Sequence, residues 1–388
     1  MKNRYATLVL SDGALYPGTL TGEENSLPRI GEVVFNTAMS GYQEIITDPS
    51  YRGQIVCFTY PSIGNYGFTP EDNESDRTWL EGIIVKDYCE VPSNFRSEGT
   101  LSSFLDTEGI PGITGIDTRA LVRHIRESGS MKGGIFSGQI TKESDEYKSA
   151  MQNLASAPDM EGANLTDIFD AKSSGEFSKA YIKEQLKENN TSENKTLRIA
   201  ALDFGIKNSI IKNLIDAGME PDIFPGDLPI EKWENFNPEN YAGFFFSNGP
   251  GDPAAVTNGI ENIKKITKYK KPIFGICLGH QMLSLALGAK TGKLKFGHHG
   301  GNQPVKGVDS NKVIITAQNH GFAVEGDFFE SEFFKSAGGV YEINPNDNTI
   351  EGYYLEKESI LSIQYHPEAG PGPNDALFIF KKFKEMVE

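Results

Sequence analysis

One cysteine stands in a setting that favours nucleophilic chemistry. Cys277 lies between Gly275 and Gly279 in the segment GICLGHQ at 275–281, where an apolar run ends and an apolar helical pattern begins. A residue at such a sharp strand-to-helix turn takes strained backbone angles, and flanking glycines let neighbouring chain approach closely. A thiol at the start of a helix also faces unpaired backbone N–H groups and the positive end of the helix dipole, which favour the thiolate. The segment predicts a reactive thiolate, with a buried structural cysteine behind a glycine-rich turn as the alternative.

A cysteine nucleophile needs a general base and a group that holds the base in position. Among the six histidines, His366 is our candidate, because it is followed by Pro367 and Glu368 at the end of an apolar run. Residues two apart in an extended segment project from the same side, so His366 and Glu368 point together, and the proline ends the strand. A carboxylate beside an imidazole fixes its tautomer and stabilises its protonated form. We predict Cys277 as nucleophile, His366 as base and Glu368 as orienting group; taken alone, His366 also fits an ordinary histidine at a strand end.

The other histidines fit the role of base less well. His280 is on the helix three residues after the cysteine, where its side chain cannot easily reach back to the thiol. His298 and His299 fall in a glycine-rich stretch that we expect to be a flexible turn, His320 in a loop after a strand, and His124 in the first part of the chain. Their spacing matches no metal-binding motif, so we expect no metal site.

Two glycines are candidates for stabilising negative charge during the reaction. Gly249 and Gly251 lie in SNGPGDP at 247–253, directly after a predicted strand. Their backbone N–H groups, with that of Leu278, are placed to face a developing oxyanion, although a plain Gly/Pro turn is the alternative. The chain has neither a G-x-x-x-x-G-K-[ST] loop nor a G-x-G-x-x-G fingerprint, so we expect no nucleotide site on it.

Composition limits the kinds of partner. The 388 residues suggest two domains or more, and a net charge of -16 argues against binding a nucleic-acid backbone. Three cysteines without C-x-x-C spacing predict neither a disulfide framework nor a zinc ribbon, and we expect Cys57 and Cys89 to be packed in the interior. The N-terminus lacks an apolar signal core, and no stretch approaches the roughly 20 apolar residues of a membrane span. We therefore expect a cytoplasmic protein without a membrane segment.

Periodicity divides the chain into three parts. Residues 1–150 predict a β-rich α+β domain, with Asp117 and Gly129 bounding its clearest helix. Its predicted strands are 6–10, 14–20 (a hairpin with the first), 32–35, 54–60 and 82–87, and its helices 102–107 and 118–127. Residues 151–196, rich in Lys, Glu, Ser and Asn, predict a linker carrying one or two helices.

Residues 197–388 predict a doubly wound α/β domain, in which catalytic loops lie at the carboxyl ends of the strands. The predicted strands are 197–202, 221–224, 243–247 and 272–276, alternating with helices such as 206–217 and 278–286. After residue 290 the pattern is strand-dominated, with 312–316, 350–354 and 360–365 before a closing helix at 374–387.

Three motifs in this second half resemble a class I glutamine amidotransferase domain. They are SNGPGDP at 247–253, GICLGHQ at 275–281 and HPE at 366–368. The resemblance implies a doubly wound domain with a mixed sheet. It also implies that Cys277 attacks the side-chain amide of glutamine, releasing ammonia and a glutamyl thioester that water hydrolyses to glutamate.

Further motifs resemble the small subunit of carbamoyl phosphate synthetase across nearly the whole chain. They are SGYQEIITDPSY at 40–51, YPSIGN at 60–65, GIDTRAL at 115–121, LDFGIK at 202–207 and FGHHGGN at 296–302. The resemblance implies the residues that hold glutamine: Ser50, Gly249, Gly251, Leu278, Gln281, Asn319, Gly321 and Phe322. Amide and hydroxyl groups suit the charged ends of this substrate, and backbone groups near Cys277 suit its side chain.

The same resemblance implies a separate large subunit. Ammonia would pass to it through an internal tunnel and be used with bicarbonate, ATP and magnesium to make carbamoyl phosphate for arginine and pyrimidine synthesis. This chain would then carry no cofactor of its own. Two alternatives remain: the amidotransferase part of another synthetase, against which the β-rich first domain argues, and a non-catalytic regulatory relative, against which the intact Cys277, His366 and Glu368 argue.

Overall fold

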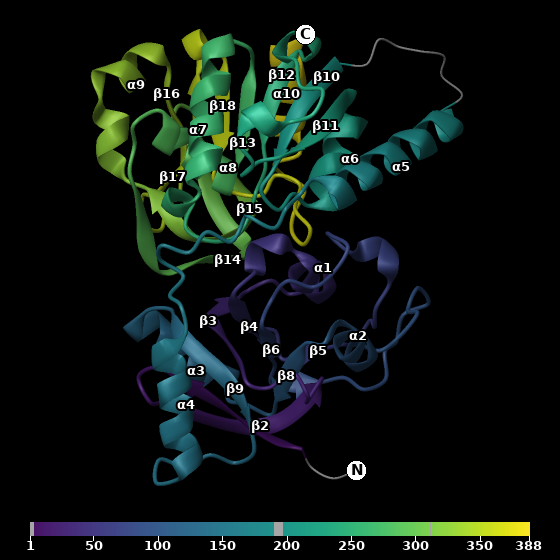
Figure 1. Cartoon of the computed structure of the whole chain (residues 1–388), viewed down its shortest axis with the longest axis vertical. Coiled ribbons are helices and arrows are strands. Elements are labelled where there is room, and N and C mark those ends of the chain that lie inside the picture. Colours follow the sequence, from purple (N-terminus) through teal and green to yellow (C-terminus); the bar gives the residue numbers. More distant parts are fainter. Residues whose placement is uncertain (1–3, 190–196, 311) are drawn as a thin grey trace. The chain divides into compact units, whose positions relative to one another are not determined.

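The computed structural model describes residues 4–189, 197–310 and 312–388, and the chain divides into two compact units (Figure 1). The first unit consists of Met1–Ala163 with Lys295–Gly300, and the second of Asn164–Leu294 with Gly301–Glu388.

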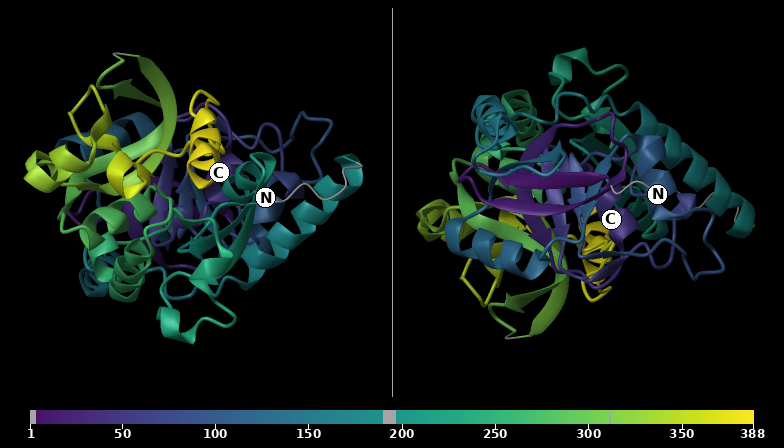
Figure 2. Two further views of the ribbon diagram at one scale, coloured as in Figure 1. Left: turned by 90° about the horizontal axis from the view of Figure 1, so that it is seen from above. Right: turned by 90° about the horizontal axis from the view of Figure 1, so that it is seen from below.

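The first unit is built around a closed β-barrel with the strand order β1-β2-β8-β6-β4-β3-β9. Figure 2 shows its curved strands from below, in purple and blue. The strands are β1 (Tyr5–Leu10), β2 (Leu15–Gly22), β3 (Arg29–Asn36), β4 (Gln54–Phe58), β6 (Gly82–Ile84), β8 (Pro111–Thr114) and β9 (Met131–Ser137). The predicted first hairpin is confirmed, because β1 and β2 are antiparallel neighbours.

Two short strands and four α-helices complete this unit. The predicted strand at 82–87 is wrong in its length, since the chain leaves the barrel after β6 and forms β7 (Asp87–Tyr88), which pairs with β5 (Ser62–Ile63). The helices are α1 (Tyr42–Thr47), α2 (Leu101–Glu108), α3 (Thr118–Ser128) and α4 (Asp145–Ser156). Asp117 caps α3 by accepting a hydrogen bond from the backbone N–H of Ala120, as its residue type predicts.

The second unit contains a nine-stranded mixed sheet with the order β11-β10-β12-β13-β18-β17-β16-β14-β15. Its strands from β11 to β18 in this order run parallel, and β17 and β16 then run antiparallel to their neighbours. The strands are β10 (Leu197–Asp203), β11 (Met219–Pro225), β12 (Gly243–Phe246), β13 (Ile273–Ile276), β14 (Thr291–Gly307), β15 (Val313–Val324), β16 (Gly339–Ile343), β17 (Ile350–Leu355) and β18 (Ile360–Ile363).

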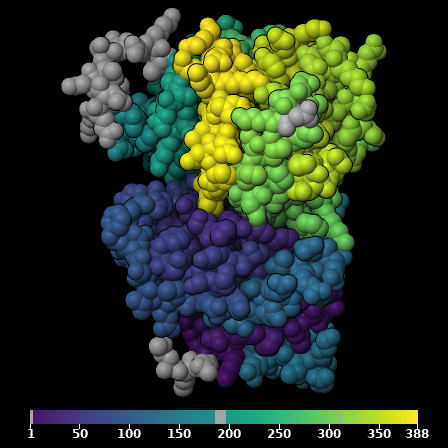
Figure 3. Space-filling view, turned by 180° about the vertical axis from the view of Figure 1, so that it is seen from behind, coloured from purple at the N-terminus to yellow at the C-terminus, as the bar shows by residue number. Residues whose placement is uncertain are grey.

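Helices cover both faces of the parallel part of this sheet. They include α6 (Asn208–Asp216) and α10 (Phe378–Val387) on one face and α7 (Thr257–Ile266) and α8 (Leu278–Ala286) on the other. Two further helices are α5 (Lys172–Asn189) and α9 (Glu332–Ala337). In the space-filling view of Figure 3, the yellow C-terminal segment lies at the surface between teal and green segments of this unit.

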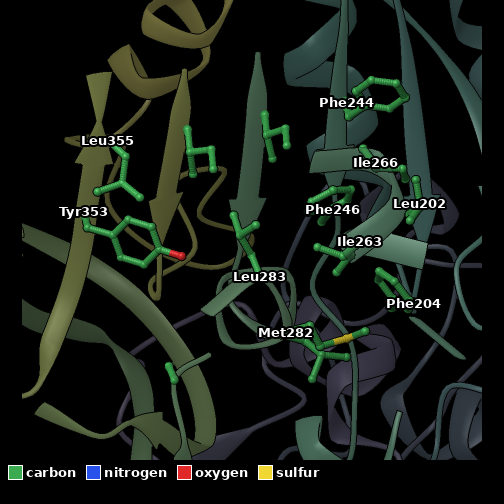
Figure 4. Packing of buried hydrophobic residues seen from close by; sticks show 14 of the residues in the cluster. Leu202, Phe204, Phe244, Phe246, Ile263, Ile266, Met282, Leu283, Tyr353 and Leu355 are labelled. Atoms are coloured by element: carbon green, nitrogen blue, oxygen red, sulfur yellow. The ribbon is translucent and has the colours of Figure 1, made fainter. Parts of the chain in front are cut away.

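Strand β12 shows why both faces are covered. Phe244 and Phe246 pack with residues of α7 and α8, whereas Phe245 packs with residues of α6 and α10. All three rings are fully buried, and Figure 4 shows Phe244 and Phe246 in the first of these clusters. Successive side chains of a strand point to opposite faces, so an uninterrupted apolar run requires cover on each. The predicted doubly wound α/β architecture is confirmed.

Two expectations about histidine segments are wrong. His298 and His299 lie inside the long strand β14 rather than in a flexible turn, and His320 lies inside β15 rather than in a loop. The glycines around them suggested a turn, but strand pairing accommodates glycine where the backbone bends. No helix in the described part of the chain is long and apolar enough to cross a membrane.

Candidate active site

Cys277 occupies a strained turn between β13 and α8. Its backbone angles are φ 52° and ψ -105°, outside the regions that L-residues favour. The flanking glycines explain how the turn fits: a Cβ on Gly279 would overlap the backbone oxygen of Phe246, and one on Gly275 would lie 3.0 Å from the backbone of Gly279. Strain of this kind costs about 1–3 kcal/mol and is held by the surrounding structure. The turn has the geometry predicted for a nucleophile elbow.

The sulfur of Cys277 is buried among polar groups. The residue is 2% exposed, and its Sγ lies 3.6 Å from the backbone oxygen of Asn319 and 3.7 Å from Nε2 of Gln364. Its backbone N–H donates to the oxygen of Ile363 at 2.9 Å, which ties the elbow to the end of β18. The thiol therefore faces both an acceptor and a donor.

His366 and Glu368 reach this site because β18 runs parallel to β13. Ile276 pairs with Ile363, so the residues that follow the two strands emerge at the same edge of the sheet. Nδ1 of His366 donates to Oε1 of Glu368 at 2.7 Å, which leaves Nε2 as the nitrogen that can accept a proton. Nε2 is buried and makes no hydrogen bond to any residue that the structure describes.

The protonated form of His366 is strongly favoured. Burial alone would lower its pKa, but the charges of Glu368 and Cys277 outweigh this and raise the pKa of His366 to about 10. Burial would likewise raise the pKa of Glu368, yet Lys207 and His366 lower it to about 2. The pair is therefore an imidazolium and a carboxylate over the neutral pH range.

Lys207 is a member of this site that sequence reasoning missed. Its Nζ lies 3.0 Å from Oε1 of Glu368 and 2.8 Å from the backbone oxygens of Ala369 and Gly370, and its side chain is 2% exposed. It follows β10 at the same edge of the sheet. The signals in the sequence were its place at the end of the LDFGIK motif at 202–207 and a lysine a few residues after the apolar strand, and a solvated lysine there would look the same.

Comparison with known proteins covers nearly the whole chain. Residues 8–135 match the family model of the carbamoyl-phosphate synthase small chain, CPSase domain, and residues 200–386 match that of glutamine amidotransferase class-I. A carbamoyl phosphate synthase small chain from Syntrophotalea carbinolica is 46% identical, over 99% of this chain and 98% of that protein. One from Thermosynechococcus vestitus is 44% identical, over 97% and 95%. The chain belongs to the carbamoyl phosphate synthase small chain family.

Family membership settles the class of enzyme. This small chain is the glutamine amidotransferase subunit of a carbamoyl phosphate synthase, and the amidotransferase domain is the part that contains Cys277. A solved glutamine amidotransferase from Thermotoga maritima aligns with a TM-score of 0.36 at 20% identity, covering 45% of this chain and 77% of that one.

Several of the residues expected to hold glutamine lie together in the second unit of this small chain. Nε2 of Gln281 donates to the backbone oxygen of Phe322 at 2.7 Å, and the Cys277 sulfur faces the backbone oxygen of Asn319. Leu278 is the first residue of α8, so its N–H has no acceptor within the helix. Gly321 continues β15 between Asn319 and Phe322.

The glycine loop after β12 approaches the same elbow. A Cβ on Gly249 would lie 2.8 Å from Cδ2 of Leu278 and would overlap the oxygen of Phe204, so only glycine fits there. Gly251 has φ 90° and forms a bridge with Asn164. Ser50 belongs to the first unit, in a short 3-10 helix (Pro49–Tyr51), where its N–H donates to Oδ1 of Asp48 at 2.8 Å. The roles of all these residues in binding glutamine stay predictions.

The histidines that do not belong to the proposed set have protein partners of their own. Nδ1 of His320 donates to the backbone oxygen of Phe322 at 2.8 Å. Nδ1 of His280 lies 2.9 Å from Oγ of Ser362, and burial lowers the pKa of His280 to about 3, so it stays neutral. The absence of a metal site remains an expectation from the sequence.

Proposed function

We propose that Cys277 is the nucleophile of glutamine hydrolysis in this small chain and that the ammonia it releases passes to a large subunit. The observation that carries the proposal is the buried, hydrogen-bonded pair of His366 and Glu368 beside a thiol held on a strained elbow. Before the attack the proton of the thiol is already on Nε2 of His366, as its raised pKa favours, and the sulfur, as thiolate, attacks the side-chain carbonyl carbon of glutamine.

The tetrahedral intermediate carries a negative oxygen, which the N–H groups of Gly249 and Leu278 are proposed to stabilise. Such donors each contribute about 3 kcal/mol to lowering a barrier. His366 returns its proton to the leaving nitrogen, so that ammonia departs and a glutamyl thioester remains on Cys277. Water, deprotonated by His366, then attacks the thioester, which yields glutamate and the free thiol.

The proposed partner is a large subunit that binds ATP and magnesium and uses the ammonia with bicarbonate to make carbamoyl phosphate for arginine and pyrimidine synthesis. No cofactor is assigned to this chain. The name small chain, carried by relatives that match almost end to end, supports such a partner.

A reconstituted two-chain complex tests the proposal. Carbamoyl phosphate synthesis is measured with glutamine or with free ammonia for wild type and for Cys277→Ser, with Cys89→Ser as the matched control. Cys89 is a free cysteine of the first unit whose Sγ lies 3.2 Å from the oxygen of Val91. We expect Cys277→Ser to lose synthesis from glutamine and to keep synthesis from ammonia, and Cys89→Ser to keep both.

Two outcomes would count against the proposal in different ways. If Cys277→Ser still used glutamine, the nucleophile would be another residue. If the wild-type complex made no carbamoyl phosphate from glutamine, although its large subunit was active with ammonia, the proposed delivery of ammonia would be wrong.

A further inference from the structure

Gln364 touches the nucleophile from the strand that also leads to the base. It follows β18 directly, is fully buried, and its backbone N–H donates to the oxygen of Glu351 at 2.8 Å. Its side chain extends to the elbow, where Nε2 lies 3.7 Å from Sγ of Cys277. Neither the HPE motif that follows it nor the scheme above gives this amide a role.

The orientation of the Gln364 amide is set by its neighbours. A backbone oxygen can only accept, so the group of Gln281 that contacts the oxygen of Phe322 at 2.7 Å must be its NH₂. The same nitrogen lies 3.0 Å from the other amide, and that contact is favourable only if Oε1 of Gln364 accepts. The NH₂ of Gln364 is then left to face the sulfur. The backbone carbonyl of Phe322 therefore fixes the orientation of the Gln281 amide and, through it, that of the Gln364 amide.

We infer that Gln364 is a positioning residue that donates a hydrogen bond to the Cys277 thiolate and holds it on the line of attack. The inference rests on the proposed role of Cys277 as nucleophile. Two neighbours of the sulfur interact with different protonation states of Cys277: the backbone oxygen of Asn319 with the thiol, and the amide of Gln364 with the thiolate. The thiol can donate to the oxygen of Asn319 at 3.6 Å, a contact that disappears once the proton has moved to Nε2 of His366. The N–H of Gln364 remains, and its bond becomes charge-assisted as the sulfur gains negative charge.

The charged groups of the site act together with this amide. His366 faces the sulfur, with Glu368 and Lys207 behind it. Of the nearby histidines, His280 is neutral, and Nδ1 of His320 donates to the same oxygen of Phe322 as Gln281 does. None of these side chains hydrogen bonds to the amide of Gln364 in the described part of the chain. A substitution of Gln364 therefore removes one neutral donor and leaves the charges of the site in place.

Gln364→Met tests the inference, because methionine has a similar length and no N–H. Ser362→Ala is the matched control: Ser362 lies two residues earlier, in β18, and it hydrogen bonds to His280 rather than to the sulfur. Thiolate formation is followed without substrate by absorbance at 240 nm against pH, subtracting the curve of Cys277→Ser. We expect the midpoint to rise by about one pH unit in Gln364→Met, since a bond to a charged group is worth about tenfold or more, and to stay unchanged in Ser362→Ala.

Turnover of glutamine gives a second readout. In Gln364→Met the kcat should fall about tenfold below the new midpoint and recover as the pH rises, because the lost donor changes how much thiolate forms. A purely structural role would lower kcat at every pH. An unchanged titration midpoint in folded Gln364→Met would overturn the inference; if that variant does not fold, Gln364→Leu is measured in its place. The titration needs no turnover, so it stands apart from a failure of the proposed glutamine reaction.

Discussion

The ion pair between Lys207 and Glu368 allows a sharp prediction about stability. The two side chains are 2% and 0% exposed, with 3.0 Å between Nζ and Oε1, and the lysine also donates to two backbone oxygens. Lys207→Met removes the cation while keeping most of the apolar stem. It leaves a buried carboxylate with His366 as its remaining counter-charge, and two carbonyls without their donor.

The expected cost is about 3–5 kcal/mol in the free energy of unfolding, the usual range for breaking a buried pair by removing one partner. The pair between Lys270 and Glu358 provides a control at the same kind of contact. Its atoms are 2.7 Å apart, but the lysine side chain is 71% exposed. Lys270→Met should therefore cost less than about 1 kcal/mol.

Urea unfolding measures both variants. The chain has two tryptophans, Trp79 in the first unit and Trp233 in the second, so a Trp79→Phe background makes the fluorescence of Trp233 report on the second unit alone. Combining Lys207→Met with Glu368→Gln should cost less than the sum of the single changes, because the double variant no longer buries an uncompensated charge.

The prediction would be contradicted if Lys207→Met lowered the free energy of unfolding by no more than Lys270→Met does. The same conclusion would follow if the two changes at the buried pair were simply additive, since the carboxylate would then not depend on the lysine.

Two further predictions concern the same site. The pKa of Glu368 is lowered from 4.5 to about 2 and that of His366 is raised from 6.5 to about 10, so their contribution to stability should be fullest between about pH 4.5 and 6.5. It should fall as acid takes the pH toward 2 and as alkali takes it toward 10, and urea midpoints across this range should lose much of the alkaline fall in His366→Gln. Gly279→Ala should destabilise the second unit by about 1–3 kcal/mol or more and abolish glutamine hydrolysis, because its Cβ would overlap a backbone oxygen of β12. Gly326→Ala, whose Cβ would meet nothing within 4 Å, should leave the melting temperature nearly unchanged, and an equal effect of the two would refute the steric argument.

Local signals explain which elements were predictable from the sequence. The elbow at Cys277 was recognisable because glycines on both sides of it mark a turn, and α8 and the cap of α3 follow from apolar spacing and residue type. Strands β8 and β9 were not predicted, because Pro111 and a pair of glycines in β9 resemble loop sequence. Barrel closure supplies the pairing that overrides those weak local preferences.

The candidate site was predictable only in part, because some of its contacts join residues that are far apart in the sequence. His366 and Glu368 are two residues apart, so a strand-end geometry was enough to associate them. Lys207 meets Glu368 across a large separation in sequence, and Gln364 meets Cys277 only because β13 and β18 are neighbours in the sheet. Such contacts depend on strand order, which periodicity does not contain.

The place of β18 in the sheet has a consequence for the timing of activity during synthesis. It lies between β13 and β17, yet it follows every other described strand of this sheet in the sequence. A nascent chain therefore displays Cys277 long before the strand that brings His366 has left the ribosome, and translation proceeds from the N-terminus. Until that strand inserts, His366 is not held beside Cys277, and the sheet lacks the strand between β13 and β17. If Cys277 and His366 act as proposed, a chain without β18 in place does not hydrolyse glutamine and releases no ammonia.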